Sequence, residues 1–394
     1  SFTAIYISKD LRIVHVVPPE EVPEGSDGTG SSWENAVGDI SEAYRMAGAY
    51  RGEVWLKRGT YTPAGAMMPR SNVAIRGGFA GNETSADAAD PVANPTIIDG
   101  NSTTTDFIYT GQATNCVIEG VTIKRFVNNA IRLTGSSTLY LRNCTIESIA
   151  PTTSTAAINP KPVWVYGGII AENCMFKANA RNIYLSNPGT PTTIATNAFL
   201  NCQFINNRFY DTSGTPTVGS TIFSAGTIPI VISNCVFTGN ISKHYDSAPV
   251  IRYACDSLVI DSRFEGNEAQ YTARAPIHIT GGKHLFIRCS FETNKVNTST
   301  AYYYPSVAAV VYQTGGQTMF RDCLFRGNKA PTSTTKAYAD NQGSASVLAI
   351  GSCESTFVNC TIEGNSASAT ASSGSAATII GNNAPRIAMV NCIV

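Results

Sequence analysis

Asn234-Cys235-Val236-Phe237-Thr238-Gly239-Asn240 is one copy of a unit that recurs along this chain of 394 residues. Successive copies lie 23 to 37 residues apart. The other copies begin at Gly120, Asn143, Asn173, Asn201, Asp261, Arg288, Asp322, Asn359 and Asn391. A repeat of this length is typical of a solenoid, in which each copy forms one structural unit that packs only on its neighbours.

The repeated unit has the periodicity of a β-strand. In Leu258-Val259-Ile260-Asp261-Ser262-Arg263-Phe264, every second side chain is apolar or small. Such side chains point to one face of a strand, so the residue at the cysteine position and the Phe or Ile two places later are both predicted to face the core. We expect Phe264 to stack between Phe237 and Phe291 in the neighbouring copies.

Eight of the eleven cysteines occupy this core position: Cys144, Cys174, Cys202, Cys235, Cys289, Cys323, Cys360 and Cys392. A free cysteine packs as a small hydrophobic residue, so we predict a ladder of buried thiols without disulfides. Paired Cys-x-x-Cys spacing, which zinc sites require, does not occur in the sequence. We therefore predict neither a metal site nor a cofactor.

Each copy ends in an asparagine turn and is preceded by a second strand. Asn240 and its equivalents follow the aromatic residue by three places, and we expect them to sit in the left-handed region and to bond to the copies above and below. Small residues and then aliphatic ones, as in Ala275-Pro276-Ile277-His278, form the preceding strand, and Gly281-Gly282 turns between the two strands. The predicted fold is all-β: a single-stranded right-handed parallel β-helix with a short N-terminal capping helix.

Four segments resemble known surface proteins. Gly167–Ile170 and the Phe-x-x-Asn units resemble the repeats of polymorphic outer-membrane and autotransporter-type proteins. Ser31–Ala36 and Val54–Tyr61 are similar to the entrance of pectate-lyase-like β-helices, and Gly77–Thr84 resembles a surface protein of the Bacteroides type. The resemblance implies a pectin-lyase-like repeat protein that is secreted or lies on the outer-membrane surface of a Gram-negative bacterium.

We predict three parts of the chain: an N-terminal strand and linker over residues 1–30, a capping helix over 31–53 and the parallel β-helix over 54–394. Ser31 and Glu34 have the spacing of a capping box, which marks a helix start. The last four residues, Asn391–Val394, stop inside a copy of the repeat. We therefore expect the β-helix to be truncated at its C-terminus.

The sequence favours a binding protein over an enzyme. Lysine plus arginine equals aspartate plus glutamate, at 28 each, which gives no reason to expect nucleic acid as a partner. No run of 18 apolar residues occurs, so this segment is not predicted to insert into a membrane. We predict no catalytic residues: Asp256, Asp261 and Glu265 are interpreted as solvated charges, and His278 and His284 as structural. The alternatives are a polysaccharide lyase or glycoside hydrolase, and a structural stalk.

Tyrosines concentrate in the segments of variable length that follow the asparagine turn. They are Tyr210, Tyr245, Tyr271, Tyr302, Tyr303, Tyr304 and Tyr338. Segments inserted at one corner of a solenoid lie on one side of it, so these rings can form a binding face for a glycan or a surface protein. The competing interpretation is that they shield the edge of the sheet. Carbohydrate binding by an adhesin-like protein is our prediction.

Overall fold

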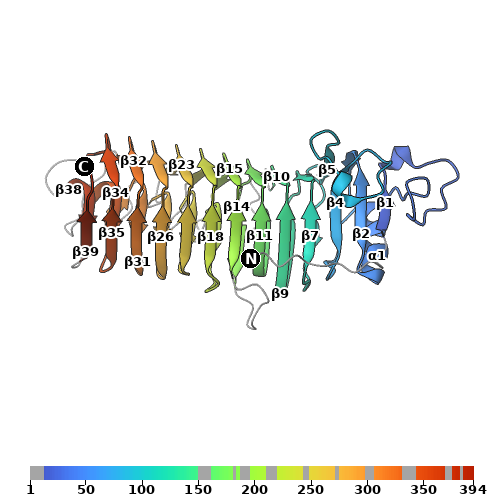
Figure 1. Cartoon of the computed structure of the whole chain (residues 1–394), viewed down its shortest axis with the longest axis horizontal. Helices are drawn as coiled ribbons and strands as arrows, with labels where there is room; N and C mark the ends of the chain where they lie inside the picture. Colours follow the sequence, from blue (N-terminus) through green and yellow to red (C-terminus); the bar gives the residue numbers. More distant parts are fainter. Residues whose placement is uncertain are drawn as a thin grey trace.

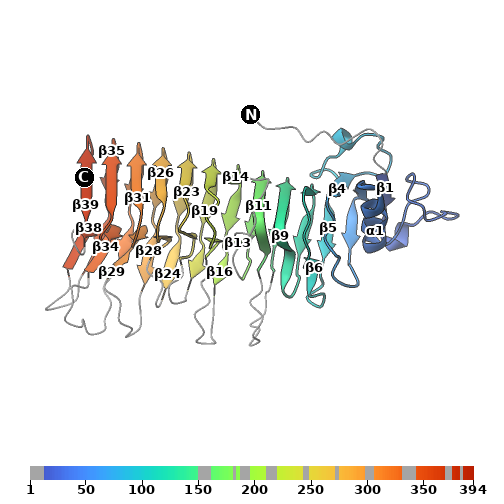
Figure 2. The ribbon, with the colours of Figure 1, turned by 90° about the horizontal axis from the view of Figure 1, so that it is seen from below.

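A computed structural model shows a right-handed parallel β-helix drawn out into a rod (Figure 1). It describes residues 13–149, 161–180, 183–186, 196–209, 220–242, 248–270, 275–297, 306–330, 343–368, 375–381 and 385–394. The coils contribute strands to up to three parallel sheets, and successive coils stack along the rod (Figure 2). The fold predicted from the repeat is confirmed.

The largest sheet has 22 strands and takes two strands or strand segments from most coils. We call the first of these the leading half and the second the trailing half. The leading half contains β6 (Asp106–Tyr109), the start of β9 (Asn129–Arg142) and of β11 (Val163–Glu172), β13 (Ile183–Ser186), β17 (Ile222–Ser224), β21 (Ile251–Tyr253), β25 (Ile277–Ile279), β29 (Ser306–Ala308), β30 (Val311–Gln313), β34 (Gly343–Ile350) and β38 (Ser375–Gly381). The trailing half contains β1 (Ile13–Val16), β2 (Glu53–Lys57), β4 (Ala74–Phe79), β7 (Cys116–Glu119), the ends of β9 and β11, β14 (Asn197–Leu200), β18 (Ile230–Ser233), β22 (Ser257–Ile260), β26 (Lys283–Ile287), β31 (Gln317–Arg321), β35 (Glu354–Val358) and β39 (Arg386–Val390).

Two smaller sheets complete the rod, and the shorter one begins only at Arg208. The middle sheet contains β3 (Gly59–Tyr61), β5 (Thr96–Asp99), β8 (Thr122–Lys124), β10 (Thr145–Glu147), β12 (Met175–Lys177), β15 (Gln203–Ile205), β19 (Val236–Thr238), β23 (Arg263–Glu265), β27 (Ser290–Glu292), β32 (Leu324–Arg326) and β36 (Thr361–Glu363). The short sheet contains β16 (Arg208–Phe209), β20 (Ile241–Ser242), β24 (Glu268–Gln270), β28 (Lys295–Asn297), β33 (Lys329–Ala330) and β37 (Ser366–Ala367). The outward side chains of every sheet therefore form rows that run along the rod.

The core is built from stacked copies of the repeat. Phe264 is 1% exposed, and its ring stacks on Phe237 at 4.9 Å and on Phe291 at 4.8 Å between centroids, as predicted. All eleven cysteines are free thiols, and only Cys392 among them is partly exposed. The Cys235 Sγ donates to the carbonyls of Ser233 and Phe199, both at 3.3 Å, so the thiols are hydrogen-bonded to the backbone of their own coil and of the preceding one.

The asparagine turns stack as predicted, but the left-handed residues are different ones. Asn240 Nδ2 donates to the Phe204 carbonyl at 3.0 Å and to Asn267 Oδ1 at 2.9 Å, which ties three coils together. Positive φ is found one residue earlier, at Gly239 (64°), and at Asn234 (52°), which begins the copy. The buried Asn240 does not have a positive φ, and its hydrogen bonds to the neighbouring coils are made by its side chain.

The capping helix begins later than the predicted capping box. The helix α1 covers Ile40–Tyr50, and its N-cap is Asp39, whose side chain accepts from the Ser41 N–H at 2.8 Å. The prediction of a start at Ser31 is wrong because the residues after it form bends and a turn, in which the Asn35 N–H donates to the Ser32 carbonyl, and Val37 then pairs with a strand. Val37 forms a parallel bridge with Val16 and accepts a hydrogen bond from the Val17 N–H. Two short 3₁₀ turns lie nearby, Pro19–Glu21 and Ala86–Ala88.

Candidate functional site

The seven tyrosines predicted to form a binding face lie outside the described residues. They are Tyr210, Tyr245, Tyr271, Tyr302, Tyr303, Tyr304 and Tyr338. The segments that contain them directly precede strands of the leading half in the sequence: residues 271–274, for example, are followed by β25. The outer face of the leading half is therefore the described surface nearest in sequence to the predicted one.

That outer face carries an unbroken row of aromatic and basic side chains, which we call the aromatic row. Strand pairing places one residue of the row directly beside the next in eight successive positions. In order, they are Tyr109, Arg132, Trp164, Tyr184, Phe223, Arg252, His278 and Tyr312. Neighbouring strands are about 4.8 Å apart, so the rings and cations lie at near-van der Waals spacing along the rod.

The alternation of each leading strand explains the row. In Ile251-Arg252-Tyr253, Ile251 and Tyr253 are fully buried while Arg252, between them, points outward. The same pattern holds in β25, where Ile277 and Ile279 are buried on either side of His278. Because the pairing is parallel and in register, the central residues stack without interruption.

Trp164 contacts two basic side chains and the next aromatic ring of the row. The Arg132 guanidinium carbon lies 4.0 Å from the Trp164 ring centroid, and Lys161 Nζ lies 4.2 Å from it. Tyr184 meets Trp164 edge to face at 5.4 Å, and Phe223 follows Tyr184 at 5.2 Å. These contacts fix the rings and hold two cations against them by cation–π attraction.

Accessibility falls along the row. Tyr109 is 37% exposed, the members from Arg132 to Arg252 are half-buried, and His278 and Tyr312 are only 3% and 6% exposed. Burial, together with the neighbouring Tyr166, raises the pKa of Tyr184, so it stays a neutral phenol. Among the described residues, nothing hydrogen-bonds to the buried Nε1 of Trp164. The part from Tyr109 to Arg252 is thus the accessible stretch of the row.

The row carries positive charge. Arg132 and Arg252 belong to it, Lys161 lies beside it against the Trp164 ring, and its eight members include no carboxylate. The acid at its N-terminal end, Asp106, accepts from both the backbone and the side chain of Asn129. The surface therefore combines flat apolar rings with positive charge, which suits a ligand that has apolar faces and anionic groups.

The carboxylates considered in the sequence do not come together. Asp256 lies at the turn into β22, Asp261 at the turn after it, and Glu265 in the middle sheet. Asp261 pairs with Arg288 at 2.7 Å and Glu265 with Arg263 at 2.7 Å. These two are outer-surface ion pairs, and Asp256 instead accepts from the Lys283 N–H at 2.8 Å.

The two histidines differ. His284 lies inside the rod, 3% exposed, where its ring stacks on Tyr253 at 4.8 Å and its Nδ1 is 2.9 Å from the Ser257 hydroxyl. Its position is structural. His278 instead belongs to the aromatic row, 5.1 Å from the Tyr312 ring.

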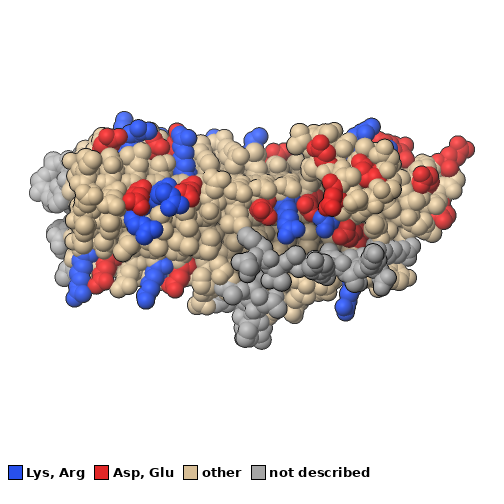
Figure 3. All heavy atoms as spheres, viewed as in Figure 1, with Lys and Arg blue, Asp and Glu red and all other residues tan. Residues whose placement is uncertain are grey.

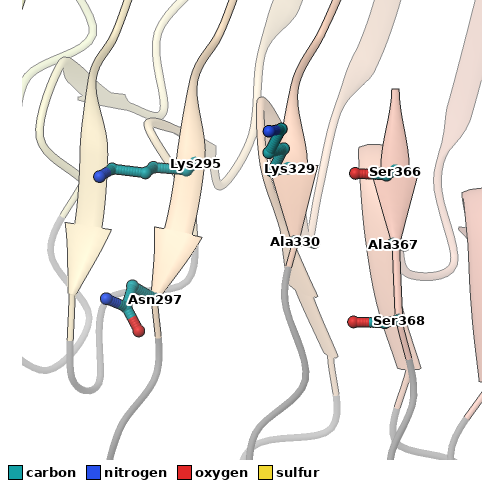
Figure 4. A pocket seen from close by; sticks show the side chains of 7 residues that line it. All are labelled: Lys295, Asn297, Lys329, Ala330, Ser366, Ala367 and Ser368. Carbon is teal, nitrogen blue, oxygen red and sulfur yellow. The ribbon is translucent and has the colours of Figure 1, made fainter. Parts of the chain in front are cut away.

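A shallow pocket on the short sheet is a weaker candidate. Figure 4 shows Lys295, Lys329 and Ser366 on successive strands of that sheet. Lys295 is engaged by Glu268 at 2.9 Å. None of the described residues that line this pocket is aromatic, so they offer no platform for a sugar ring.

Within the described ranges, no group of three His, Cys, Asp or Glu side chains is arranged to hold a metal ion. In the same part of the chain, no helix is long and apolar enough to span a bilayer.

The aromatic row was missed by sequence reasoning although a signal for it exists. Its members differ in type, from Trp to Arg to His, so they do not appear as a repeated letter. The signal is positional: from Arg132 to Tyr312, each residue of the row lies between two buried residues of its strand, and each is aromatic or basic. The length variation of the loops is a separate signal, and it indicates the loop tyrosines instead of this row.

Comparison with known proteins finds similar solved structures but no matching family. No family model and no curated protein matches the chain. Among solved structures, the catalytic unit of a thermostable GH87 α-1,3-glucanase from Streptomyces thermodiastaticus strain HF3-3 is 13% identical, with a TM-score of 0.43 over 97% of this chain and 71% of that one. A PL6-family polysaccharide lyase from Pseudopedobacter saltans is 12% identical, with a TM-score of 0.36 over 93% and 92%. An endo-xylogalacturonan hydrolase from Aspergillus tubingensis is 10% identical, with a TM-score of 0.31 over 95% of each chain.

Proposed function

We propose that this chain is a secreted or cell-surface β-helix that binds an extended acidic glycan along its aromatic row. The observation that carries the proposal is the in-register row from Tyr109 to Arg252, with ring contacts of 5.2 to 5.4 Å and cations 4.0 and 4.2 Å from Trp164. A polymer lying along the rod meets one such side chain in every coil.

The chemistry of the row favours a sugar polymer with negative groups. The apolar faces of sugar rings pack on Trp164, Tyr184 and Phe223, while Arg132 and Arg252 attract carboxylate or sulfate groups. Because no carboxylate belongs to the row, nothing in it repels an anion. An adhesin-like role on the outer surface of a Gram-negative bacterium fits such a ligand, and we propose that localisation with it.

The proposal is tested with Trp164→Ala. Loss of its ring and of the cations it positions should weaken binding of polygalacturonate or alginate about tenfold, which corresponds to about 1.4 kcal/mol. Isothermal titration calorimetry and affinity electrophoresis measure the change, with neutral dextran as the uncharged probe. The matched control is Tyr140→Ala, another half-buried aromatic, on the outer face of the trailing half. Equal binding by the parent protein and Trp164→Ala would overturn the proposal.

A polysaccharide lyase is the second candidate function. Lys161 is 4% exposed and lies against Trp164 in an electropositive row, and a basic side chain beside a uronate can remove the proton that starts elimination. Elimination creates a conjugated product that absorbs near 235 nm. A steady rise with polygalacturonate, lost in Lys161→Met, would favour the lyase, and binding without such a rise favours the binding protein. Absence of both would leave the structural stalk.

A further inference from the structure

The accessible part of the aromatic row has a basic side chain at each end of three rings. Arg132 is followed by Trp164, Tyr184, Phe223 and Arg252, one in each of five successive coils. We call these five side chains the five-coil site. Its two guanidinium groups lie against the outer rings, with Arg132 4.0 Å from the Trp164 centroid and Arg252 5.8 Å from the Phe223 centroid.

The strand spacing sets the distance between the two arginines. Four intervals of about 4.8 Å place Arg132 and Arg252 about 19 Å apart along the rod. In an extended chain of 1,4-linked sugars, one unit is about as long as the spacing between two coils. A glycan that brings an anionic group to each arginine therefore has at least five units, with these two groups four units apart.

The core and the neighbouring side chains hold both arginines in place. Arg132 Nη1 donates to the Tyr109 hydroxyl at 3.2 Å, which orients its guanidinium group. Arg252 lies between Ile251 and Tyr253, which are both fully buried, so its backbone is fixed in the stack. A fixed distance selects ligands by length, because a chain that is too short cannot contact both ends at once.

The two ends of the five-coil site differ. Lys161 Nζ lies 4.2 Å from the Trp164 centroid and 4.9 Å from that of Tyr184, so it adds a second positive charge near Arg132. Lys161 is only 4% exposed and acts through its charge. A chain of two or three units is therefore expected to bind at the Arg132 end of the site.

Cations on the trailing half of the sheet have a different setting. Figure 3 shows that face, on which most Lys and Arg side chains lie beside Asp or Glu. Arg142, in the same strand as Arg132, is 3.8 Å from Glu172 in the next coil. A neighbouring carboxylate offsets its charge, so Arg142 is a matched control for the arginines of the five-coil site.

We infer that the aromatic row selects acidic glycan chains of five or more sugar units, because only these reach both Arg132 and Arg252. This selectivity rests on the proposed glycan binding and adds the length and charge spacing of the ligand. Charges on the three middle units are not needed, since those units lie over Trp164, Tyr184 and Phe223. The ligand class therefore includes partly esterified acidic chains as well as fully charged ones.

Calorimetric titration with oligogalacturonates of two to eight units tests the length dependence. The Kd of the parent protein should fall about tenfold or more between three and five units, when the second arginine is reached, and by less than about threefold from six to eight units. A pentamer esterified on its three middle units should bind within about threefold of the fully charged pentamer. Esterification of the first and fifth units instead should weaken binding about tenfold.

Two variants separate the ends of the site. Arg252→Gln should weaken binding of the hexamer about tenfold and of the trimer less than about twofold, because the trimer binds at the other end. Arg132→Gln should weaken both. Arg142→Gln should leave both within about twofold of the parent, and circular dichroism establishes that each variant is folded.

The outcomes distinguish this inference from the proposed function. A trimer that binds as tightly as the hexamer, or equal weakening of both by Arg252→Gln, would overturn the selection by length and leave glycan binding by the row intact. Absence of binding by the octamer and by polygalacturonate at millimolar concentration would overturn both. Binding that is unchanged in Arg132→Gln and in Arg252→Gln would also overturn both, because another surface would then hold the glycan.

Discussion

The leading and trailing halves of the largest sheet have similar inward-facing side chains and different outward-facing ones. Inward positions are apolar in both: Ile251 of the leading half and Val259 of the trailing half are each fully buried in the same coil. Outward, the leading half presents Arg252 and its aromatic neighbours, while the trailing half presents Leu258 and Ile260. Stacking constrains the inward side chains, and the outward ones are free to differ.

Alternate residues of each strand therefore have different roles: inward ones stabilise the fold, and outward ones form the surface. An inward substitution disturbs the contact with the coils above and below, whichever half it lies in. An outward substitution changes what the surface binds. The expected effects on stability therefore fall steeply from the shared core to the surface.

The largest effect is expected in the shared core. Phe264→Ala removes a ring stacked at 4.9 and 4.8 Å between two others, so unfolding should become easier by about 3–5 kcal/mol. Urea denaturation followed by circular dichroism measures the loss, and the coils nearest to Phe264 should loosen first because repeats contact only their neighbours.

The control for Phe264→Ala is Val236→Ala, at an outward position of the adjacent coil. It should cost less than about 1 kcal/mol, since the side chain is half-buried and leaves no internal cavity. Equal losses for the two variants would contradict the division between inward and outward positions.

The repeated core was predictable because most copies use the same residue types at the inward positions. Stacked, in-register strands require similar side chains at inward positions, so the cysteine position and Phe264 recur visibly. The helix start was not predictable in the same way, because pairing of Val37 with Val16, twenty-one residues earlier, overrode a local signal at Ser31. Local patterns do not reveal such a distant competitor.

The candidate site was less predictable than the fold for a different reason. Stacking does not require one residue type at outward positions, so Trp164, Arg132 and Phe223 belong to one row although they are different residues. Strand alternation alone indicates which residues point outward. Only the register shows that they lie side by side.

A change of pH is expected to have an intermediate effect on stability, through the buried His284 and His15 of the trailing half. Burial is the main cause that lowers the pKa of His284 from its ordinary value of 6.5, and the same holds for His15. The unfolded chain therefore binds these protons more readily than the rod does, and stability falls as pH drops below about 6.5 towards the lower pKa of the folded state. Above pH 6.5 this contribution is fully present.

Urea midpoints between pH 8 and pH 5.5 measure this dependence. His284→Gln should reduce the slope of the urea midpoint against pH and leave the part of it due to His15. This holds even if the variant also changes the midpoint at pH 8. A midpoint that rises on acidification, or a slope unchanged in His284→Gln, would show that the imidazole is not held neutral by burial.

The smallest effect on stability is expected from the predicted loop tyrosines. Tyr271, Tyr303 and Tyr304 belong to segments that precede β25, β29 and β30 of the leading half in the sequence. If they extend the glycan surface of the aromatic row, changing all three to alanine should weaken glycan binding several-fold, because each ring is a stacking platform. The thermal midpoint should hardly move, since surface changes shift stability by under about 0.5 kcal/mol each. Calorimetric titration and a thermal melt of one sample separate the two outcomes. A triple variant that melts several degrees earlier and binds normally would assign the tyrosines to shielding the sheet edge, leaving the binding surface to the row from Tyr109 to Arg252.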